Sequence, residues 1–262
     1  MEYNEIVVEI EEHLRIITIN KPKAMNSVSP LTSQEMEHAM NEFCDNKDEW
    51  VCIITGAGDR AFCAGNDLKW QSQNMDIIAK EFGKLECGFA GITSRKNCYK
   101  PVIAAVNGVA LGGGFEIALA SDIIIASENA TFGLPEPRVG MIAMAGGVHR
   151  LPRQIPYHLA MEMMLTARKI DAAEARKLGI VNEIAAAGEL MDTARKYAKE
   201  IMKGAPLAIQ ATKESVIDGK DMPVEEAIEY KGPIFQAMMK SSDVMEGSMA
   251  FIEKREPNWK GA

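Results

Sequence analysis

The sequence predicts an α/β protein whose largely parallel strands are buried on both faces and whose last third is helical. Short apolar runs alternate with segments of helical spacing in the first part of the chain, and short turns that contain glycine separate them. Strand-like runs become rare after Leu159, where helical segments follow one another. No low-complexity linker and no repeat of fixed period interrupts the 262 residues, so we expect the helical part to extend the core.

The first elements are expected to be two strands, a helix and a third strand. Residues 5–10 and 13–20 carry apolar side chains around a short polar gap, which suits a β-hairpin that Pro22 ends. Residues 32–45 have apolar side chains at helical spacing, and the run 51–55 is typical of a buried strand.

The middle and last parts of the chain are interpreted by the same criteria. Residues 76–97 have mixed helical spacing, 101–106 and 122–126 are expected to be buried strands, and 115–121 a helix between them. The expected helices of the last third end at glycines and cover residues 160–166, 172–178, 189–203 and 206–218.

Charge and cysteine content exclude several classes of protein. The chain carries 29 Lys and Arg residues against 37 Asp and Glu and has no basic run, so it lacks the charge pattern of a nucleic-acid binder. Its 5 cysteines are odd in number and lack CxxC spacing, which favours a reducing compartment over a disulfide framework. The start of the chain is acidic, and no apolar run approaches the ~18 residues of a membrane span. We expect a cytoplasmic protein that binds neither nucleic acid nor membrane.

Two segments are candidates for loops that donate backbone hydrogen bonds. Residues 61–68 follow the strand at 51–55, so their N–H groups should be exposed at the carboxyl end of that strand, where α/β sheets bind ligands. The tract Gly112-Gly113-Gly114 follows the strand at 101–106 and opens the next helix, which places its amides at the positive end of a helix dipole. Two converging amides of this kind form an oxyanion hole.

Two glutamates flank the strand that follows this glycine tract. Glu116 belongs to the first turn of the helix, and Glu136 lies on a turn stiffened by Pro135. Carboxylates that face one ligand couple their titrations, so one can donate a proton while the other accepts one. Each feature alone is more often structural, since a glutamate in a first helical turn is usually only a favourable dipole partner. Together they indicate proton transfer next to a carbonyl.

These motifs resemble the enoyl-CoA hydratase (crotonase) superfamily over nearly the whole chain, from residue 7 to residue 259. The segments that carry the resemblance are 21–27 (KPKAMNS), 62–68 (FCAGNDL), 107–116 (NGVALGGGFE), 132–140 (FGLPEPRVG), 146–152 (GGVHRLP) and 250–255 (AFIEKR). The resemblance implies a spiral of ββα units, here residues 1–195, that carries the active site. It also implies a helical trimerisation region, here residues 196–262, in a homotrimer or a homohexamer.

The resemblance also implies roles for single residues. The amides of Asn66 and Gly113 would hold the thioester oxygen, Glu116 would deprotonate water for attack at C3, and Glu136 would protonate C2. The coenzyme A or substrate contacts that it suggests are Lys23, Ala24, Met25, Ala64, Asp67, Leu68, Lys69, Trp70, Gly112, Met144, Phe251 and Lys254. The substrate would be an acyl-CoA thioester, and no separate cofactor is needed, because coenzyme A is part of the substrate.

Retention of both glutamates favours an enoyl-CoA hydratase, a hydro-lyase, over an isomerase, because isomerases of this family typically keep only the counterpart of Glu136. Isomerisation or another reaction through a CoA enolate remains the alternative, and so does an acyl-CoA-binding protein without activity. One departure concerns the substrate: Ala143-Met144 stands where such hydratases often have Pro-Gly or Pro-Asp, so Met144 would cap the water site or line an acyl pocket. Segments 179–182 and 222–227 also resemble carnitinyl-CoA dehydratases.

Two other expectations concern metals and assembly. The four histidines lack metal-ligand spacing and no serine lies in a GxSxG elbow, so we expect neither a metal nor a serine nucleophile. The tail is expected to build the oligomer, because its apolar faces exceed what a surface appendage should carry. The residues of these faces are Leu190, Ala194, Tyr197 and Ile201, followed by Leu207, Ile209, Val216 and Ile217.

Overall fold

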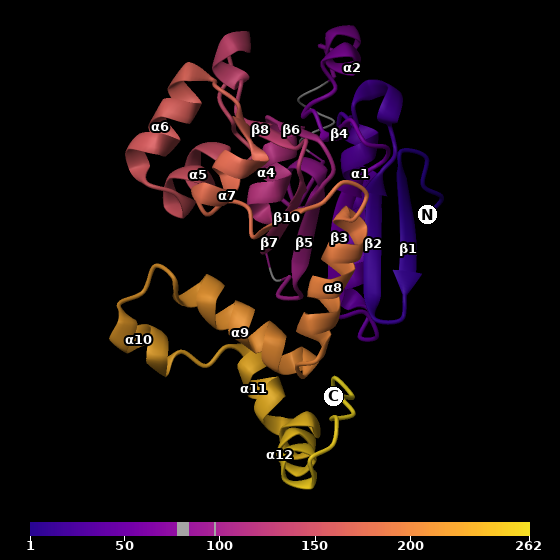
Figure 1. The fold of residues 1–262 in the computed structure, drawn as a ribbon, viewed down its shortest axis with the longest axis vertical. Helices are drawn as coiled ribbons and strands as arrows, with labels where there is room; N and C mark the ends of the chain where they lie inside the picture. Colours follow the sequence, from indigo (N-terminus) through magenta and orange to yellow (C-terminus); the bar gives the residue numbers. More distant parts are fainter. Residues whose placement is uncertain (78–83, 97) are drawn as a thin grey trace.

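Two β-sheets form the centre of the computed structural model, which describes residues 1–77, 84–96 and 98–262 (Figure 1). In the larger sheet the strand order is β1-β2-β3-β5-β7-β10, and in the smaller it is β4-β6-β8-β9. The strands of the larger sheet are β1 (Ile6–Glu11), β2 (Leu14–Ile19), β3 (Val51–Gly56), β5 (Val102–Val106), β7 (Ile123–Ser127) and β10 (Glu183–Ala185). Those of the smaller sheet are β4 (Ala61–Cys63), β6 (Val109–Leu111), β8 (Thr131–Gly133) and β9 (Ile170–Asp171).

Successive pairs of strands contribute one strand to each sheet. The chain passes from β3 to β4, from β5 to β6 and from β7 to β8, and neighbouring strands of these pairs are parallel in both sheets. Only the β1–β2 hairpin and the β8–β9 pair are antiparallel among the described residues. This arrangement is the α/β spiral of ββα units that the resemblance implies.

The central strands are buried on both faces, as their continuous apolar sequences predict. Ile16, Ile53 and Ile103 point to one face of the larger sheet, under α8 (Leu190–Met202). Ile17 and Ile54 point to the other face, toward α1 (Pro30–Asp45) and the smaller sheet. Alternation of side chains along a strand therefore supplies two separate apolar cores.

Some helices of the first two thirds of the chain lie where the sequence predicted them, and others do not. Besides α1, they are α2 (Leu68–Gln73), α4 (Gly113–Ala120), α5 (Gly147–Gln154), α6 (Tyr157–Thr166) and α7 (Ala172–Lys177), with 3-10 turns η1 (Pro22–Ala24), η2 (Phe89–Gly91) and η3 (Glu136–Val139). The helix expected at 76–97 lies partly outside the described residues, since 78–83 and 97 are not described. In the described stretch 84–96 it is wrong: Gly88 and Gly91 have φ of +75° and +63°, and only η2 forms there.

The sequence interpretation also missed the short strands of the smaller sheet. Each of β4, β6 and β8 has only 3 residues, too few for a periodic pattern to be read. The donor loops therefore follow β4 and β6 rather than, as expected, the strands of the larger sheet. The site is thus built on the smaller sheet.

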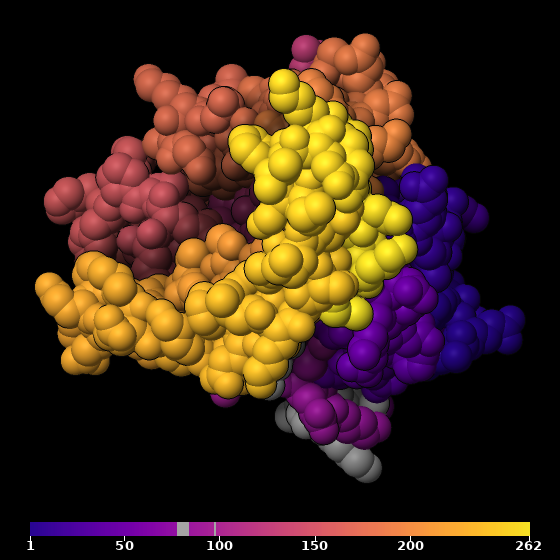
Figure 2. Space-filling model, turned by 90° about the horizontal axis from the view of Figure 1, so that it is seen from below, coloured from indigo at the N-terminus to yellow at the C-terminus, as the bar shows by residue number. Residues whose placement is uncertain are grey.

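The last helices extend from the core at its lower end in Figure 1, and Figure 2 shows them crossing the face seen from below. They are α9 (Pro206–Gly219), α10 (Val224–Glu229), α11 (Pro233–Lys240) and α12 (Asp243–Glu253). Lys213 of α9 forms an ion pair of 2.7 Å with Asp122, and the buried carboxylate of Glu214 accepts hydrogen bonds from the first turn of α11.

The apolar face of α8 is used inside the chain, contrary to expectation. Leu190 and Ala194 are buried against the larger sheet, and Tyr197 and Ile201 pack beside them. The expected boundary between residues 195 and 196 falls within this helix. Exposed apolar side chains lie further along, on α9 to α12, and they include Val216, Val224, Ile228, Met239, Met245, Phe251 and Ile252.

Candidate active site

The two donor loops lie in contact with each other. Gly65, with φ of +93°, packs so closely on the second loop that a Cβ there would lie 2.8 Å from the carbonyl oxygen of Leu111 and 3.2 Å from the nitrogen of Gly113. The parallel pairing of β4 with β6 brings the two loops to the same edge of the smaller sheet. Segments 61–68 and 112–114, which are far apart in sequence, therefore meet as predicted.

Two backbone N–H groups at this contact have no acceptor among the residues that the structure describes. Val28 bonds to either side of Asn66, since its N–H donates to Gly65 and its carbonyl oxygen accepts from Asp67, which leaves the Asn66 N–H unused. Gly113 is the first residue of α4, where an N–H has no partner within the helix. Two unpaired amides on touching loops suit a ligand oxygen with developing negative charge.

Glu116 is held in the interior by α4 and by the start of α5. The residue is only 3% exposed, and its Oε1 accepts a hydrogen bond of 2.8 Å from the N–H of Gly147. Burial, with a smaller contribution from the charge of Glu136, raises the pKa of this carboxyl to about 7, although the backbone hydrogen bonds from Gly147 and Ala145 oppose the rise. The group is therefore poised to exchange a proton near neutral pH.

Glu136 opens η3 directly after β8 and faces the second donor loop. A Cβ on Gly112 would lie 3.0 Å from its Oε1, so the carboxyl lies against the glycine tract. Its Oε2 is buried and has no hydrogen-bond partner among the described residues. Burial raises the pKa of this carboxyl as well. An unpaired buried carboxyl oxygen favours the protonated form.

The two carboxyls have different hydrogen-bond environments. Glu116 accepts a backbone hydrogen bond, which favours its ionised form, whereas Glu136 has an oxygen without a donor. The negative charge of Glu136 also raises the pKa of Glu116, so the ionisation of one carboxyl depends on that of the other. The pKa values of both carboxyls are raised, that of Glu116 to about 7, so the pair can hold a proton near neutral pH.

The early loop suggested for coenzyme A lies beside the first donor loop. Lys23 and Ala24 are exposed on η1, and the carbonyl oxygen of Met25 accepts a hydrogen bond of 3.0 Å from the N–H of Ala64. Met25 and Asn26 both have φ of +54°, a conformation that the Asn26 side chain fixes by donating to the carbonyl oxygens of Ala57 and Ala61. Backbone strain of this kind persists where the surrounding structure holds it.

Asp67 and α2 form the rim of the first loop. Asp67 caps α2 by accepting from the N–H of Trp70, and it pairs with Lys21 at 3.1 Å. Burial raises the pKa of Asp67, but these two contacts, together with the Ser27 hydroxyl, outweigh it and hold the pKa below its ordinary value. Leu68 and Lys69 are exposed, and Trp70 is half-buried.

The structure places Met144 in a segment between the two halves of the site. It is 67% exposed and lies between η3, which carries Glu136, and the Gly147 amide that binds Glu116. Met141 and Ile142 of the same segment are also exposed. The segment is therefore an apolar surface next to the carboxyl pair.

Phe251 and Lys254 are not brought to this site by their own chain. They lie at the end of α12, at the bottom of Figure 1, whereas α2 lies at the top. Phe251 is 86% exposed.

Three residues near the carboxyl pair were not assigned roles from sequence. Gly147 donates to Glu116, Phe89 packs its ring on Gly113, and the guanidinium of Arg150 folds over the Gly146-Gly147 turn. Gly147 and Arg150 belong to a segment that carried the resemblance, which was the available signal. No sequence pattern indicated Phe89, because its contact with Gly113 is long-range.

Two other features can be separated from the site. Burial raises the pKa of the Cys63 thiol to about 12, so Cys63 is a buried thiol rather than a nucleophile. Among the described residues there is no cluster of three or more His, Cys, Asp or Glu side chains that could hold a metal, and no helix long and apolar enough to cross a membrane.

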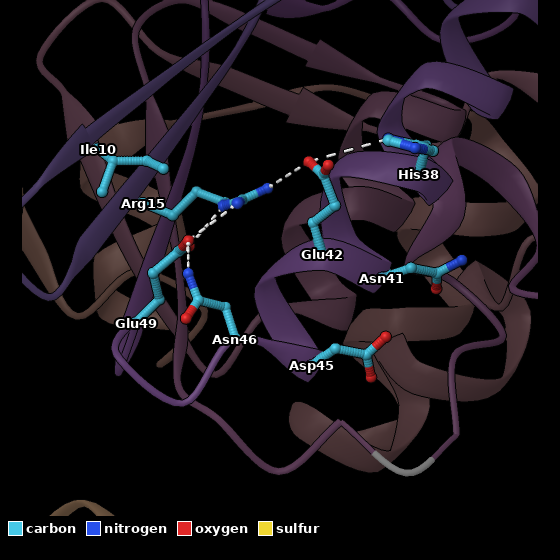
Figure 3. A pocket seen from close by; sticks show the side chains of 8 residues that line it. All are labelled: Ile10, Arg15, His38, Asn41, Glu42, Asp45, Asn46 and Glu49. Carbon is cyan, nitrogen blue, oxygen red and sulfur yellow. Dashed lines mark hydrogen bonds and ion pairs between the residues drawn. The ribbon is translucent and has the colours of Figure 1, made fainter. Parts of the chain in front are cut away.

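A polar depression between β1, β2 and α1 is a structural network (Figure 3). Glu42 contacts both His38 and Arg15, and the guanidinium of Arg15 also binds Glu49, which accepts from Asn46. Arg15 and Glu49 are buried, and their charges are paired with each other. The network joins the first hairpin to α1 and shares no residue with the Glu116–Glu136 pair.

Comparisons with known proteins agree with this geometry. A profile of the enoyl-CoA hydratase/isomerase family matches residues 9–262. The chain is 46% identical over 249 residues to carnitinyl-CoA dehydratase of Escherichia coli strain K12, with 94% of each chain covered. Among solved structures, an enoyl-CoA hydratase from Mycobacterium marinum is 40% identical with a TM-score of 0.90, covering 98% of this chain and 99% of that chain. A carnitinyl-CoA hydratase from Mycobacterium avium is 41% identical with a TM-score of 0.77 at the same coverage.

Proposed function

Because the chain belongs to the enoyl-CoA hydratase/isomerase family, as a CoA-thioester hydratase or dehydratase, we propose that it adds water reversibly across the C2=C3 bond of a 2-enoyl-CoA thioester. The single observation that carries this proposal is the placement of the buried Glu116 carboxyl and the half-buried Glu136 carboxyl beside two unpaired amides at one edge of the smaller sheet. Hydration of an enoyl thioester needs one group that accepts a proton from water and one that donates a proton to C2.

The proposed mechanism assigns each step to a group in the site. The Asn66 and Gly113 N–H groups bind the thioester oxygen and stabilise the enolate that forms when water attacks C3. The ionised Glu116 accepts a proton from that water, and the protonated Glu136 gives its proton to C2. Dehydration follows the same path in reverse, so both directions use the same one-proton form of the pair.

Both carboxyls are required by this mechanism, which separates it from the alternatives. An isomerase moves one proton between two carbons and needs a single carboxyl. The buried carboxyl of Glu116, the second of the pair, would then have no role in the reaction. A protein that only binds acyl-CoA would have no use for two carboxyls with raised pKa values. The hydratase proposal accounts for both groups.

We propose that coenzyme A binds along the rim formed by η1, the first donor loop and α2. Lys23 and Lys69 are exposed cations there, suited to phosphate groups, and Met25, Ala64, Asp67, Leu68 and Trp70 lie in the same loops. Gly112 and Met144 would contact the acyl end, because they lie beside the carboxyls. Phe251 and Lys254 would reach the coenzyme A of a neighbouring subunit in a homotrimer or homohexamer.

A 3-hydroxyacyl thioester with a trimethylammonium group is the second candidate substrate. The observation that favours it is 46% identity to a protein named carnitinyl-CoA dehydratase. The reaction is the same hydration or dehydration, so the two candidates differ only in what the acyl pocket accepts.

The test is a turnover assay that follows the absorbance of the conjugated enoyl thioester. The panel contains crotonyl-CoA, a branched and a cyclic enoyl-CoA, and the enoyl-CoA that dehydration of carnitinyl-CoA forms. We expect loss of absorbance with at least one substrate, and the ranking identifies the acyl group. Binding of CoA esters without turnover of any of them would support the binding protein instead.

A further inference from the structure

Arg150 is a half-buried cation whose guanidinium binds backbone carbonyls. It lies on α5, one turn after Gly147, and within the described chain it forms no ion pair with a carboxylate. One of its terminal nitrogens donates to the carbonyl oxygen of Thr93 at 2.8 Å, and the other lies 3.4 Å from that of Ala145. A buried cation is costly unless its contacts repay the loss of hydration. Its position therefore calls for an explanation.

One end of the guanidinium fixes the turn that binds Glu116. Gly146 has φ of +107°, and a Cβ on it would lie 2.0 Å from a guanidinium nitrogen, so Arg150 lies directly over this turn. The next residue, Gly147, supplies the N–H that donates to Glu116. Movement of the guanidinium would therefore release the turn that carries this donor.

The other end reaches the segment that packs on the second donor loop. Thr93 closely follows η2, and a Cβ on Gly113 would lie 2.4 Å from the ring of Phe89 in that turn. Arg150 thus connects the turn behind Glu116 with the segment that packs against the Gly113 amide.

The charges around Glu116 can be assigned from each element packed on α4. Glu136 of η3 raises the pKa of Glu116, and Arg150 of α5 lowers it. The Cys63 thiol of β4 is neutral, because burial raises its pKa to about 12. Strands β5 and β6 and turn η2 carry no ionisable side chain, and His149 and Arg153 of α5 are exposed. Arg150 is thus the cation that acts on Glu116 in the described chain, and Glu116 is the only charged group that acts on Arg150.

We propose that Arg150 is a positioning residue, which fixes the Gly146-Gly147 turn under Glu116 and supplies the positive charge that keeps Glu116 ionised for the reaction. The inference rests on the proposed function. It assigns to Arg150 no contact with substrate, and its effect passes through Glu116.

The test compares Arg150→Gln with Arg153→Gln by measuring kcat and kcat/KM against pH. Arg153 is exposed on the same helix and donates only to the carbonyl oxygen of His149, so its replacement is a matched control. With Arg150→Gln, we expect the acid limb of the pH profile, which reports the ionisation of Glu116, to move up by about 0.5–1 unit, because an opposite charge near that carboxyl is lost. We expect turnover at the optimum to fall up to about a hundredfold, because Glu116 loses its fixed position. Arg153→Gln should leave profile and turnover unchanged.

Arg150→Lys separates the effect of the positive charge from the effect of the two guanidinium nitrogens that bind carbonyl oxygens. A lysine keeps the positive charge but presents a single nitrogen, so it should retain the wild-type pH profile while losing turnover. The oligomeric mass and melting temperature of each variant show whether it is folded. If Arg150→Gln does not fold, the test uses Arg150→Lys alone. In that case, wild-type turnover with Arg150→Lys would overturn the positioning role.

The inference fails if folded Arg150→Gln keeps the wild-type pH profile, whatever its turnover, because a purely structural role lowers activity without moving the profile. It also fails if Arg150→Lys moves the profile as far as Arg150→Gln does. Absence of turnover by the wild-type enzyme on every enoyl-CoA would instead contradict the proposed function. The two failures are therefore distinguishable.

Discussion

Glu136 carries the proton for C2 in the proposed mechanism, and its replacement is the first prediction. Glu136→Gln keeps the shape of the side chain but removes the transferable proton. We expect turnover to fall by about 10²–10⁴-fold while affinity for the thioester changes little, because positioned acid–base groups contribute about that factor. Steady-state kinetics and calorimetry with a non-reactive CoA ester measure the two quantities. A variant that keeps more than half of wild-type turnover would remove Glu136 from the mechanism.

The buried charge of Glu116 predicts how stability depends on pH. Its pKa is about 7 in the folded protein against an ordinary value of 4.5, so the folded state binds the proton more tightly than the unfolded state. Stability from this group is therefore complete below pH 4.5 and is lost as pH rises through 7. The shift corresponds to about 3 kcal/mol as an upper bound.

Glu116→Gln should accordingly stabilise the protein more at pH 8 than at pH 5. The amide oxygen can still accept from Gly147, and no charge is buried. Melting temperatures at the two pH values test this prediction, with exposed Glu128→Gln as the control. Equal effects of Glu116→Gln at both pH values would show that its carboxylate is not destabilised by burial.

The carboxyl pair of the candidate site could be proposed from sequence, whereas the groups that surround it could not. Glu116 and Glu136 stand in motifs with flanking glycines, and the residue types themselves indicate proton transfer. The Gly147 bond and the Phe89 contact join residues that are 31 and 24 positions from their partners. Contacts of that separation are set by the packing of α4 against α5 and η2, which local patterns do not encode.

The start of α4 provides a test of the second oxyanion donor. Gly113→Pro removes its N–H, and Gly113→Ala keeps it, while both add a Cβ that meets the ring of Phe89. Proline is compatible with the first position of a helix, so α4 should still form. We expect proline to lower kcat about 10²–10³-fold beyond the effect of alanine.

The comparison of the two variants isolates the N–H from the steric effect. Both must keep the wild-type oligomeric mass and melting temperature for the result to count. Equal activity of folded Gly113→Pro and Gly113→Ala would show that the oxyanion assignment of Gly113 is wrong.

Long apolar elements were predictable, and short ones were not. The hairpin, α1, β3, β5, β7 and the helices α6 to α9 were expected close to where they lie. The strands β4, β6 and β8 are stabilised by pairing with one another in the smaller sheet. A strand of three residues is long enough for that pairing but too short to show a periodic pattern in the sequence. The donor loops were found despite this error, since their glycines mark them independently of the strand that precedes them.

The molecule as a whole leaves apolar side chains exposed on its last helices, and these predict an oligomer. Phe251 and Ile252 are among the most exposed, at 86% and 72%. Deleting the last helices would remove the backbone N–H groups that donate to the buried Glu214 carboxylate. A point variant tests the interface without this additional change. Phe251→Glu should weaken association at least tenfold, since burial of such a side chain contributes about 1.5–3 kcal/mol.

Light scattering at micromolar concentration measures the assembly, and binding of CoA esters measures the contribution of Phe251 to a neighbouring site. Ile10→Glu, an equal change at an exposed apolar position of β1, is the control and should alter neither. A wild-type monomer would contradict the proposal that the last helices assemble the protein.

The measurement that tests hydration most directly is the fate of the oxygen of water. The wild-type protein is incubated with crotonyl-CoA, and with the enoyl-CoA derived from carnitinyl-CoA, in ¹⁸O-labelled water, and the products are analysed by mass spectrometry. We expect a 3-hydroxyacyl-CoA that carries one ¹⁸O at C3, formed at least about a hundredfold more slowly by Glu136→Gln at the same enzyme concentration. A product of unchanged mass whose double bond has moved, or no product from either substrate, would contradict the proposal that this carboxyl pair adds water to an enoyl thioester.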